Sequence, residues 1–172
     1  MERGSRRPSS NLYRAWIHCG RFRLPVRVIG VDRHPGIAGL AAASSAALPL
    51  VTVIRADACA LPFADAAFDV CLCNLALHHL NVEEGLALIR RLDRLSCVGF
   101  LLVDLLRSPS GYGGVWLMTR LSCNRLIRHD GPLSVRRARS WEEYRGLVAA
   151  AAIPGLRLER HPLFRVTLSR IA

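Results

Sequence analysis

The sequence predicts an α/β domain built on a mostly parallel sheet with helices on both faces. Four short apolar runs alternate with helix-prone or loop segments, in the order strand, helix, strand, loop, strand, helix, strand. This order is typical of parallel sheets whose crossover segments cover the faces. The runs are rich in β-branched residues, as expected of strands buried on both sides. They span residues 26–32, 51–56, 68–74 and 99–105.

The first two runs enclose a predicted helix. The first run ends in the carboxylate of Asp32, and Pro35 stands where the first turn of a helix tolerates proline. The Ala-rich segment 36–47 then has a high helix propensity. The second run is again followed by an acid, Asp57.

The last two runs enclose an amphipathic helix. Asn81 is placed to cap its first turn, and Glu84 stands at the third helical position, which is the pattern of a capping box. Apolar residues recur along one stripe of this helix, whereas its arginines point elsewhere. The stripe comprises Leu86, Ile89, Leu92 and Leu95.

The two ends of the chain are less regular than its middle. Residues 1–24 form a poorly patterned segment, of which 13–24 could make a short helix, and residues 25–172 form the domain. After the fourth run we expect several elements in order. They are a helix near 115–127, a polar basic loop, a helix near 141–152 and a hairpin of 156–161 with 163–171.

Composition narrows the classes of function. A net charge of +11, from 24 basic and 13 acidic residues, suits a nucleic-acid partner. Every basic residue is Arg, however, and the arginines are scattered, so we disfavour nucleic-acid binding. No apolar run approaches the roughly 18 residues of a membrane span, and no apolar segment follows Arg6 and Arg7 as in an export signal. We therefore expect a cytoplasmic protein without a membrane partner.

The cysteines predict buried thiols rather than disulfides or a metal centre. There are six, and most lie in apolar surroundings, where a free thiol behaves as a small hydrophobe. The spacing of Cys71 and Cys73 is shorter than the usual spacing of structural zinc ligands. No metal site is expected.

Polar side chains mark three of the predicted strand ends. Asp32, Asp57 and Asn74 would lie at the carboxyl edge of the sheet, where open parallel sheets bind ligands. One acid at such an edge can accept hydrogen bonds from a ribose diol, and a second can accept one from an adenine amino group. Each acid could equally cap a helix or form a turn.

Three motifs together resemble a known family. They are Val-Ile-Gly-Val-Asp32-Arg-His-Pro, then Arg-Ala-Asp57-Ala-x-x-Leu-Pro-Phe, then Phe68-Asp-Val-x-x-x-Asn74-x-x-Leu-His78-His79-Leu. The set is similar to successive motifs of class I S-adenosylmethionine-dependent methyltransferases. The small-molecule group that includes quinone-biosynthesis and polyketide-tailoring enzymes is the most similar. The resemblance covers residues 25–108 and implies a Rossmann-like methyltransferase fold.

The resemblance also implies roles for individual residues. Asp32 would bind the ribose hydroxyls of S-adenosylmethionine with Arg33 beside the adenine, and Asp57 and Ala58 would meet the adenine edge. Asn74 and Leu75 would line the methionine part. His78 or His79 would face the substrate, where a neutral imidazole can act as general base. Alternatively, the two histidines cap the strand and begin the next loop.

The sequence departs from the family before Asp32. The Gly-rich turn is expected roughly 20 residues upstream of the ribose-binding acid, but no glycine stands near Asn11 to Tyr13. The first strand of the fold, which lies between the strands ending in Asp32 and Asn74, is therefore expected to be missing. Those two strands would then pair with each other, or an oligomer or a partner would cover their edges, or the domain would be marginally stable.

A polar segment late in the chain is the candidate substrate site. Arg128, His129 and Arg136 could hold an anionic or phenolic molecule. The alternative is a solvated basic loop that turns at Asp130-Gly131-Pro132. For the whole chain, the rivals to a methyltransferase are a non-catalytic scaffold or subunit and, less favoured, a basic nucleic-acid-binding protein.

Overall fold

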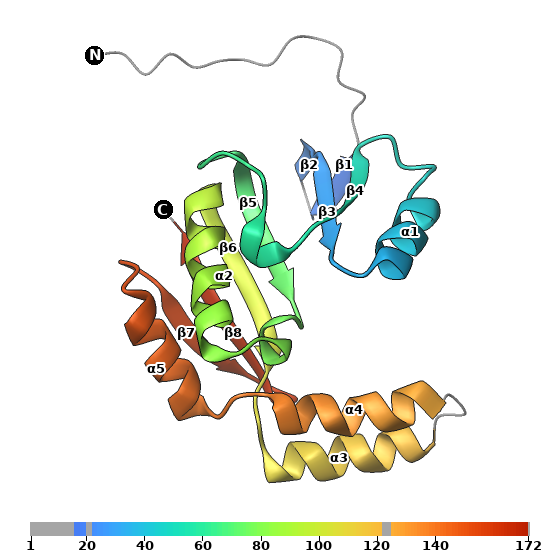
Figure 1. Cartoon of the computed structure of the whole chain (residues 1–172), viewed down its shortest axis with the longest axis vertical. Helices are drawn as coiled ribbons and strands as arrows, with labels where there is room; N and C mark the ends of the chain where they lie inside the picture. The colour runs from blue at the N-terminus through green and yellow to red at the C-terminus, as the bar shows by residue number, and fades with distance from the viewer. Residues whose placement is uncertain (1–15, 20–21, 122–124, 172) are drawn as a thin grey trace. The chain divides into compact units, whose positions relative to one another are not determined.

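A computed structural model describes residues 16–19, 22–121 and 125–171, and it describes side chains from residue 26 onward except those of 122–127 (Figure 1). The chain divides into two compact units, Met1–Leu61 and Pro62–Ala172. The boundary expected at residue 24 was inferred from patterning alone, and it stays a prediction about where the domain begins.

The first unit begins with an antiparallel hairpin rather than the helix expected over 13–24. Strand β1 (Trp16–Cys19) pairs with β2 (Phe22–Pro25). The prediction of a helix was wrong for the described part of this segment. Its residues include β-branched and aromatic types that favour strands, and this preference outweighs the weak helical pattern.

The core of the first unit is the expected strand, helix, strand arrangement. Strand β3 (Val28–Asp32) runs parallel to β4 (Val51–Arg55), and α1 (Pro35–Ser44) connects them. The side chain of His34 caps α1 by accepting bonds from the backbone N–H groups of Gly36 and Ile37. Both predicted strands and the predicted helix are confirmed.

The second unit is built on a four-stranded sheet in the order β5-β6-β8-β7. Its strands are β5 (Phe68–Asn74), β6 (Ser96–Leu105), β7 (Arg157–His161) and β8 (Arg165–Ile171). Strands β5 and β6 are parallel, whereas β8 is antiparallel to both of its neighbours. The expected C-terminal hairpin is confirmed, and its turn holds Leu163 and Phe164 at positive φ.

The strands that end in Asp32 and Asn74 each have one hydrogen-bonded neighbour within their own unit. Among the described strands, β3 has a hydrogen-bonding partner only in β4, and β5 only in β6. These two strands belong to different units, so the expectation that the strands ending in Asp32 and Asn74 pair directly stays a prediction. Within its own unit, each presents one edge of unpaired backbone groups, the kind of edge that another strand can extend.

Two capped helices lie on the same face of the four-stranded sheet (Figure 1). Helix α2 (Val82–Leu95) has the predicted capping box, with Asn81 and Glu84 each accepting a bond from the other's backbone N–H. Helix α5 (Trp141–Ala151) has a second capping box formed by Ser140 and Glu143. The buried side of each helix packs against the core. In α2 the buried stripe includes Leu88, whereas Leu86, which was predicted to belong to it, is half-buried.

The segment between β6 and α5 is a pair of helices. They are α3 (Pro109–Arg120) and α4 (Arg125–Arg137). The predicted loop with a turn at Asp130-Gly131-Pro132 was wrong, because Pro132 lies inside α4. A Cβ on Gly131 would come within 2.8 Å of the Thr119 side chain, so glycine allows α4 to approach α3 closely.

Candidate functional site

Two carboxylates lie at the carboxyl edge of the parallel pair in the first unit. Asp32 ends β3 opposite Arg55 of β4, and Asp57 follows two residues after Arg55. The parallel register therefore brings both acids to the same edge, as the sequence predicted. Arg33 is exposed, and its carbonyl accepts a 3.3 Å bond from Arg55 Nε, which ties the two strand ends together.

Both carboxylates also accept hydrogen bonds from nearby backbone N–H groups. The alternative role that the sequence left open, in a turn or a helix cap, is therefore confirmed for both. Asp32 Oδ1 accepts a 2.7 Å bond from the N–H of His34. Asp57 Oδ1 accepts a 2.9 Å bond from the N–H of Cys59 and caps the short 3₁₀ helix η1 (Ala58–Ala60). These bonds fix the orientation of each carboxylate, and a carboxylate has about four acceptor positions, so each can accept further donors.

The chain turns sharply after β5 in the second unit. Asn74 is exposed at the strand end, and Leu75 follows it at φ 56°, where its N–H donates a 2.8 Å bond to the carbonyl of Val103. A non-glycine residue at such a φ costs about 1–3 kcal/mol and is concentrated at functional sites. The turn leads into the 3₁₀ helix η2 (Leu77–His79), which carries both candidate histidines.

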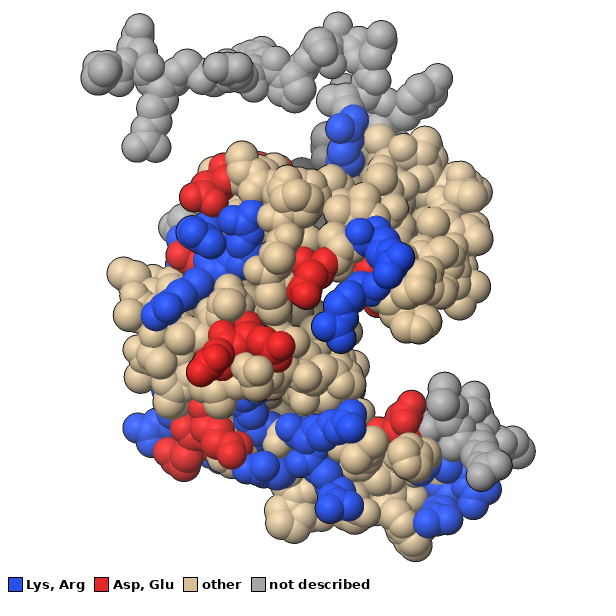
Figure 2. Space-filling model, viewed as in Figure 1, with Lys and Arg blue, Asp and Glu red and all other residues tan. Residues whose placement is uncertain are grey.

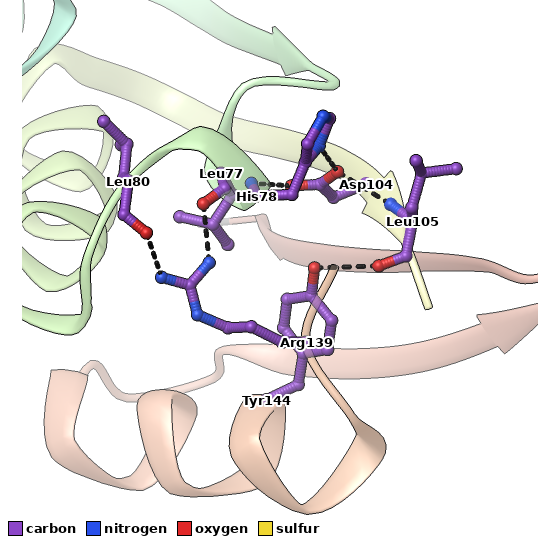
Figure 3. Close-up of polar contacts among 7 residues, drawn as sticks. All are labelled: Leu77, His78, Leu80, Asp104, Leu105, Arg139 and Tyr144. Carbon is purple, nitrogen blue, oxygen red and sulfur yellow. Dashed lines mark hydrogen bonds and ion pairs between the residues drawn. The ribbon is translucent and has the colours of Figure 1, made fainter. Parts of the chain in front are cut away.

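His78 is buried and held by Asp104 (Figure 3). Its Nδ1 lies 2.6 Å from Asp104 Oδ1, and its backbone N–H donates a 2.7 Å bond to Asp104 Oδ2. The N–H of Leu105 donates a further bond to Asp104 Oδ1. A carboxylate can only accept, so this geometry places the ring proton of His78 on Nδ1. His78 is therefore an anchored ring and a poor candidate for contact with substrate.

A buried arginine fixes the same turn from the other side (Figure 3). Arg139, which is 8% exposed, donates bonds to the carbonyls of Leu77 at 2.6 Å and Leu80 at 2.7 Å. A third bond of 3.0 Å reaches the carbonyl of Asn81. The flat guanidinium suits this task because its donors are arranged in a rigid fork.

Tyr144 completes this support. It is fully buried, and its hydroxyl donates a 3.0 Å bond to the carbonyl of Leu105, next to Asp104. Burial raises the pKa of Tyr144, with the charge of Asp104 as the second cause. The phenol is therefore a permanent hydrogen-bond donor at neutral pH.

His79 is the exposed member of the pair. Its ring contacts that of His78 with centroids 4.1 Å apart. Burial, together with the charges of His78 and Arg137, lowers the pKa of His79, and the carboxylates of Asp104 and Asp130 oppose this only in part. A neutral imidazole at pH 7 can accept a proton, so the structure favours His79 over His78 as a candidate base.

A pH titration tests this environment. Because the folded chain lowers the pKa of His79 below its ordinary value of 6.5, the unfolded chain binds the proton more tightly. Stability is therefore expected to be complete above pH 6.5 and to fall as the pH drops below it. NMR titration of the His79 ring, assigned with His79→Gln, should give a midpoint below 6.5. A midpoint at or above 6.5 would contradict the assignment.

The three candidate substrate residues lie on α4. Arg128 and His129 are exposed, and His129 Nδ1 lies 3.2 Å from Asp130 Oδ1. Arg136 lines a cavity of 410 Å³ together with Arg107 and Tyr112. Arg136 thus lines a cavity, whereas Arg128 and His129 are exposed.

Four residues of this site were missed by the sequence interpretation. They are Asp104, Arg137, Arg139 and Tyr144. Only Asp104 had a usable signal, because it ends the fourth apolar run as an acid in the same way that Asp32 ends the first. The other three reach the turn from α4, α5 and the residues between them, and such long-range contacts leave no local pattern.

Comparisons with known proteins identify the fold. A family model described as a methyltransferase domain matches residues 12–99. An S-adenosylmethionine-dependent methyltransferase from Aquifex aeolicus has a TM-score of 0.59 at 15% identity, over 83% of this chain and 67% of that chain. The plantazolicin methyltransferase BamL, solved with a triazolic analog and SAH, has a TM-score of 0.59 at 16% identity, over 81% and 51%.

One of the similar structures is an enzyme with a different name. The [4+2]-cyclase SpnF has a TM-score of 0.51 at 19% identity, over 78% of this chain and 43% of that chain. No curated protein matches the sequence.

These matches cover the chain more fully than they cover the relatives. The chain spans about half the length of BamL and of SpnF. The structural likeness shows a Rossmann-like methyltransferase fold, in which part of the sheet is antiparallel. The family model covers slightly more than half of the 172 residues, and the chain therefore belongs to the methyltransferase domain family.

Proposed function

We propose that this chain transfers a methyl group from S-adenosylmethionine to an oxygen or carbon atom of a small aromatic, quinone-like or polyketide-like molecule. Family membership supports the reaction class. The observation that carries the choice of donor is the pair of carboxylates, Asp32 and Asp57, at one edge of β3 and β4. A cytoplasmic site of action fits this donor.

The carboxylate pair fits the adenosine part of the donor. Asp32 is half-buried and pinned through Oδ1, so its remaining acceptor positions suit the two hydroxyls of a ribose. Asp57 and the backbone of Ala58 suit the edge of the adenine, and Arg33 suits its face. Asn74 and Leu75, at the sharp turn after β5, are assigned to the methionine part. The bound donor supplies an electrophilic methyl group.

His79 is assigned the role of the general base that accepts the proton of the methyl acceptor. A neutral ring beside the acceptor would take the proton of its hydroxyl or carbon acid as the new bond to the methyl carbon forms. Anchoring of η2 by Asp104 and Arg139 keeps this ring in one place, which favours alignment of the acceptor with the methyl group. Arg136 of α4, in its cavity with Arg107, is assigned to an anionic or phenolic group of the acceptor.

Calorimetric titration of the full chain with S-adenosylmethionine and with its demethylated product tests the proposal. Micromolar binding is expected, and Asp32→Ala should weaken it about tenfold or more because two hydrogen bonds to a charged group are lost. Asp69→Ala, which removes an exposed carboxylate from β5, should leave the affinity unchanged. A folded chain that binds neither compound would overturn the proposal.

A non-catalytic scaffold or subunit is the second candidate. The unpaired edges of β3 and β5 support it, because a partner strand or a second copy could extend either of them. The fold by itself does not fix the activity, since a fold can host unrelated functions. Absence of donor binding in a folded sample would favour this candidate. A nucleic-acid partner remains the less favoured alternative.

A further inference from the structure

Helix α3 has several apolar side chains that are exposed to solvent. The described part of the second unit does not cover them. Leu117 is 61% exposed, Met118 is 73% exposed and Trp116 is 43% exposed. Leu121, which directly follows the helix, is also exposed. We call these four residues the α3 surface. Exposed apolar residues gathered on one helix mark an interaction site.

The opposite side of α3 already has its partner. A Cβ on Gly131 of α4 would lie within 2.8 Å of Thr119 and 3.2 Å of Val115, so these two residues form the side of α3 that contacts α4. At the base of the helix, Gly111 packs against the ring of Phe164. Figure 1 shows the two helices side by side, extending away from the end of the four-stranded sheet. Among the side chains that the structure describes, those of α4 therefore leave the α3 surface exposed.

Positive charge accompanies the apolar residues. Residues 109–137 contain five arginines and one acid, Asp130. The Arg120 guanidinium lies 4.8 Å from the centre of the Trp116 ring, and Arg128 and Arg136 are exposed on α4. Figure 2 shows basic side chains along these helices at the lower right of the view. A partner for this hairpin must be apolar in one part and anionic in another.

We propose that the α3–α4 hairpin docks the protein onto the surface of an anionic lipid bilayer. Leu117, Met118 and Leu121 would enter the boundary between headgroups and acyl chains, with Trp116 at headgroup level. The surrounding arginines would pair with anionic headgroups, each contributing roughly fivefold to binding. A nucleic acid would satisfy the arginines alone and leave the aliphatic side chains in water, so the bilayer is the better fit.

This proposal is compatible with the absence of a spanning segment. Within the part of the chain that the structure describes, no helix has the length and apolar character needed to cross a membrane. The sequence-based expectation of no membrane partner depended on the lack of a spanning segment. A helix that lies in the plane of the membrane surface does not need to span it. Docking is independent of the methyl-transfer proposal and can hold or fail without it.

Vesicle binding of the full chain tests the proposal. Sedimentation with phosphatidylcholine vesicles containing phosphatidylglycerol should remove the protein from solution, and pure phosphatidylcholine vesicles should bind it much less. Leu117→Ser with Met118→Ser should weaken binding about tenfold or more, because two apolar side chains no longer enter the lipid. Arg120→Gln should weaken it about fivefold and reduce its dependence on salt.

Matched controls separate docking from general effects of polarity and charge. Leu40 of α1 is 67% exposed, close to the value for Leu117, so Leu40→Ser should bind vesicles like the unaltered chain. Arg157→Gln on β7 is the matched control for charge. In a chain carrying Trp16→Phe and Trp141→Phe, the fluorescence of Trp116 should shift to shorter wavelength on adding anionic vesicles.

Four outcomes would overturn the proposal. The first is equal binding to both kinds of vesicle, and the second is equal loss of binding in the Leu40→Ser variant and in the Leu117→Ser, Met118→Ser variant. The third is that the Leu117→Ser, Met118→Ser variant keeps its vesicle binding but unfolds more easily or changes its oligomeric mass, since this would mean that protein covers the α3 surface. The fourth is binding of RNA, without vesicle binding, that the Leu117→Ser, Met118→Ser changes do not affect, which would assign the hairpin to a nucleic acid.

Discussion

Arg139→Ala is expected to lower the free energy of unfolding of the second unit by about 2–4 kcal/mol, because it leaves buried carbonyls at Leu77 and Leu80 without their charged donor. The loss is measured from urea unfolding followed by circular dichroism. Arg139→Lys should recover only part of it, since one ammonium cannot reproduce the fork that spans Leu77, Leu80 and Asn81.

An exposed arginine provides the control for this experiment. Arg157 of β7 is exposed, and Arg157→Ala should change stability by no more than about 0.5 kcal/mol. If Arg139→Ala were equally harmless, the turn that carries His78 and His79 would not depend on Arg139. The NMR signal of the His79 ring gives a second readout, because a loosened turn should move it toward the behaviour of a free histidine.

Asp104→Ala is expected to be nearly as damaging, at about 3 kcal/mol. Asp104 is fully buried and accepts bonds from the backbone N–H groups of His78 and Leu105, besides its contact with the His78 ring. Removal of the carboxylate leaves these buried donors unsatisfied. Asp104→Asn keeps the volume and one acceptor oxygen, so it should retain part of the stability. Urea unfolding again gives the values.

The ion pair between Asp65 and Arg91 gives the comparison for Asp104. Its nitrogen and oxygen lie 3.6 Å apart and Asp65 is largely exposed, so Asp65→Ala should cost no more than about 1 kcal/mol. Equal effects of Asp65→Ala and Asp104→Ala would show that the buried contacts of Asp104 do not stabilise the fold. They would also remove the reason for treating His78 as an anchor.

The elements that sequence reasoning located correctly are those with a complete local pattern. Strand β5 was predicted with its observed limits, because a short run rich in apolar residues that ends in a polar residue is typical of a strand. The start of α2 was found from Asn81 and Glu84, since both bonds of a capping box form between residues close in sequence.

The errors arose where contacts across the chain outweighed local preference. Helix α4 passes through Gly131 and Pro132, two residues that locally favour a turn. Close packing of Gly131 on Val115 and Thr119 of α3 favours the helix there. Strands β1 and β2 form a hairpin where the weak side-chain pattern suggested a helix. Hydrogen bonds between the two paired strands stabilise this hairpin.

The candidate site divides in the same way. The sequence by itself determined that Asp32 and Asn74 end strands, that Asp57 closely follows one and that two histidines come after Asn74, because strand ends and short motifs are encoded by neighbouring residues. Only the tertiary structure distinguishes the surroundings of the two histidines. Asp104, 26 positions from His78 along the chain, holds the buried His78 ring, whereas His79 is exposed and its own partial burial lowers its pKa. Residues so far apart in the sequence come into contact only when the sheet and helices pack together, and no local sequence pattern predicts such a contact.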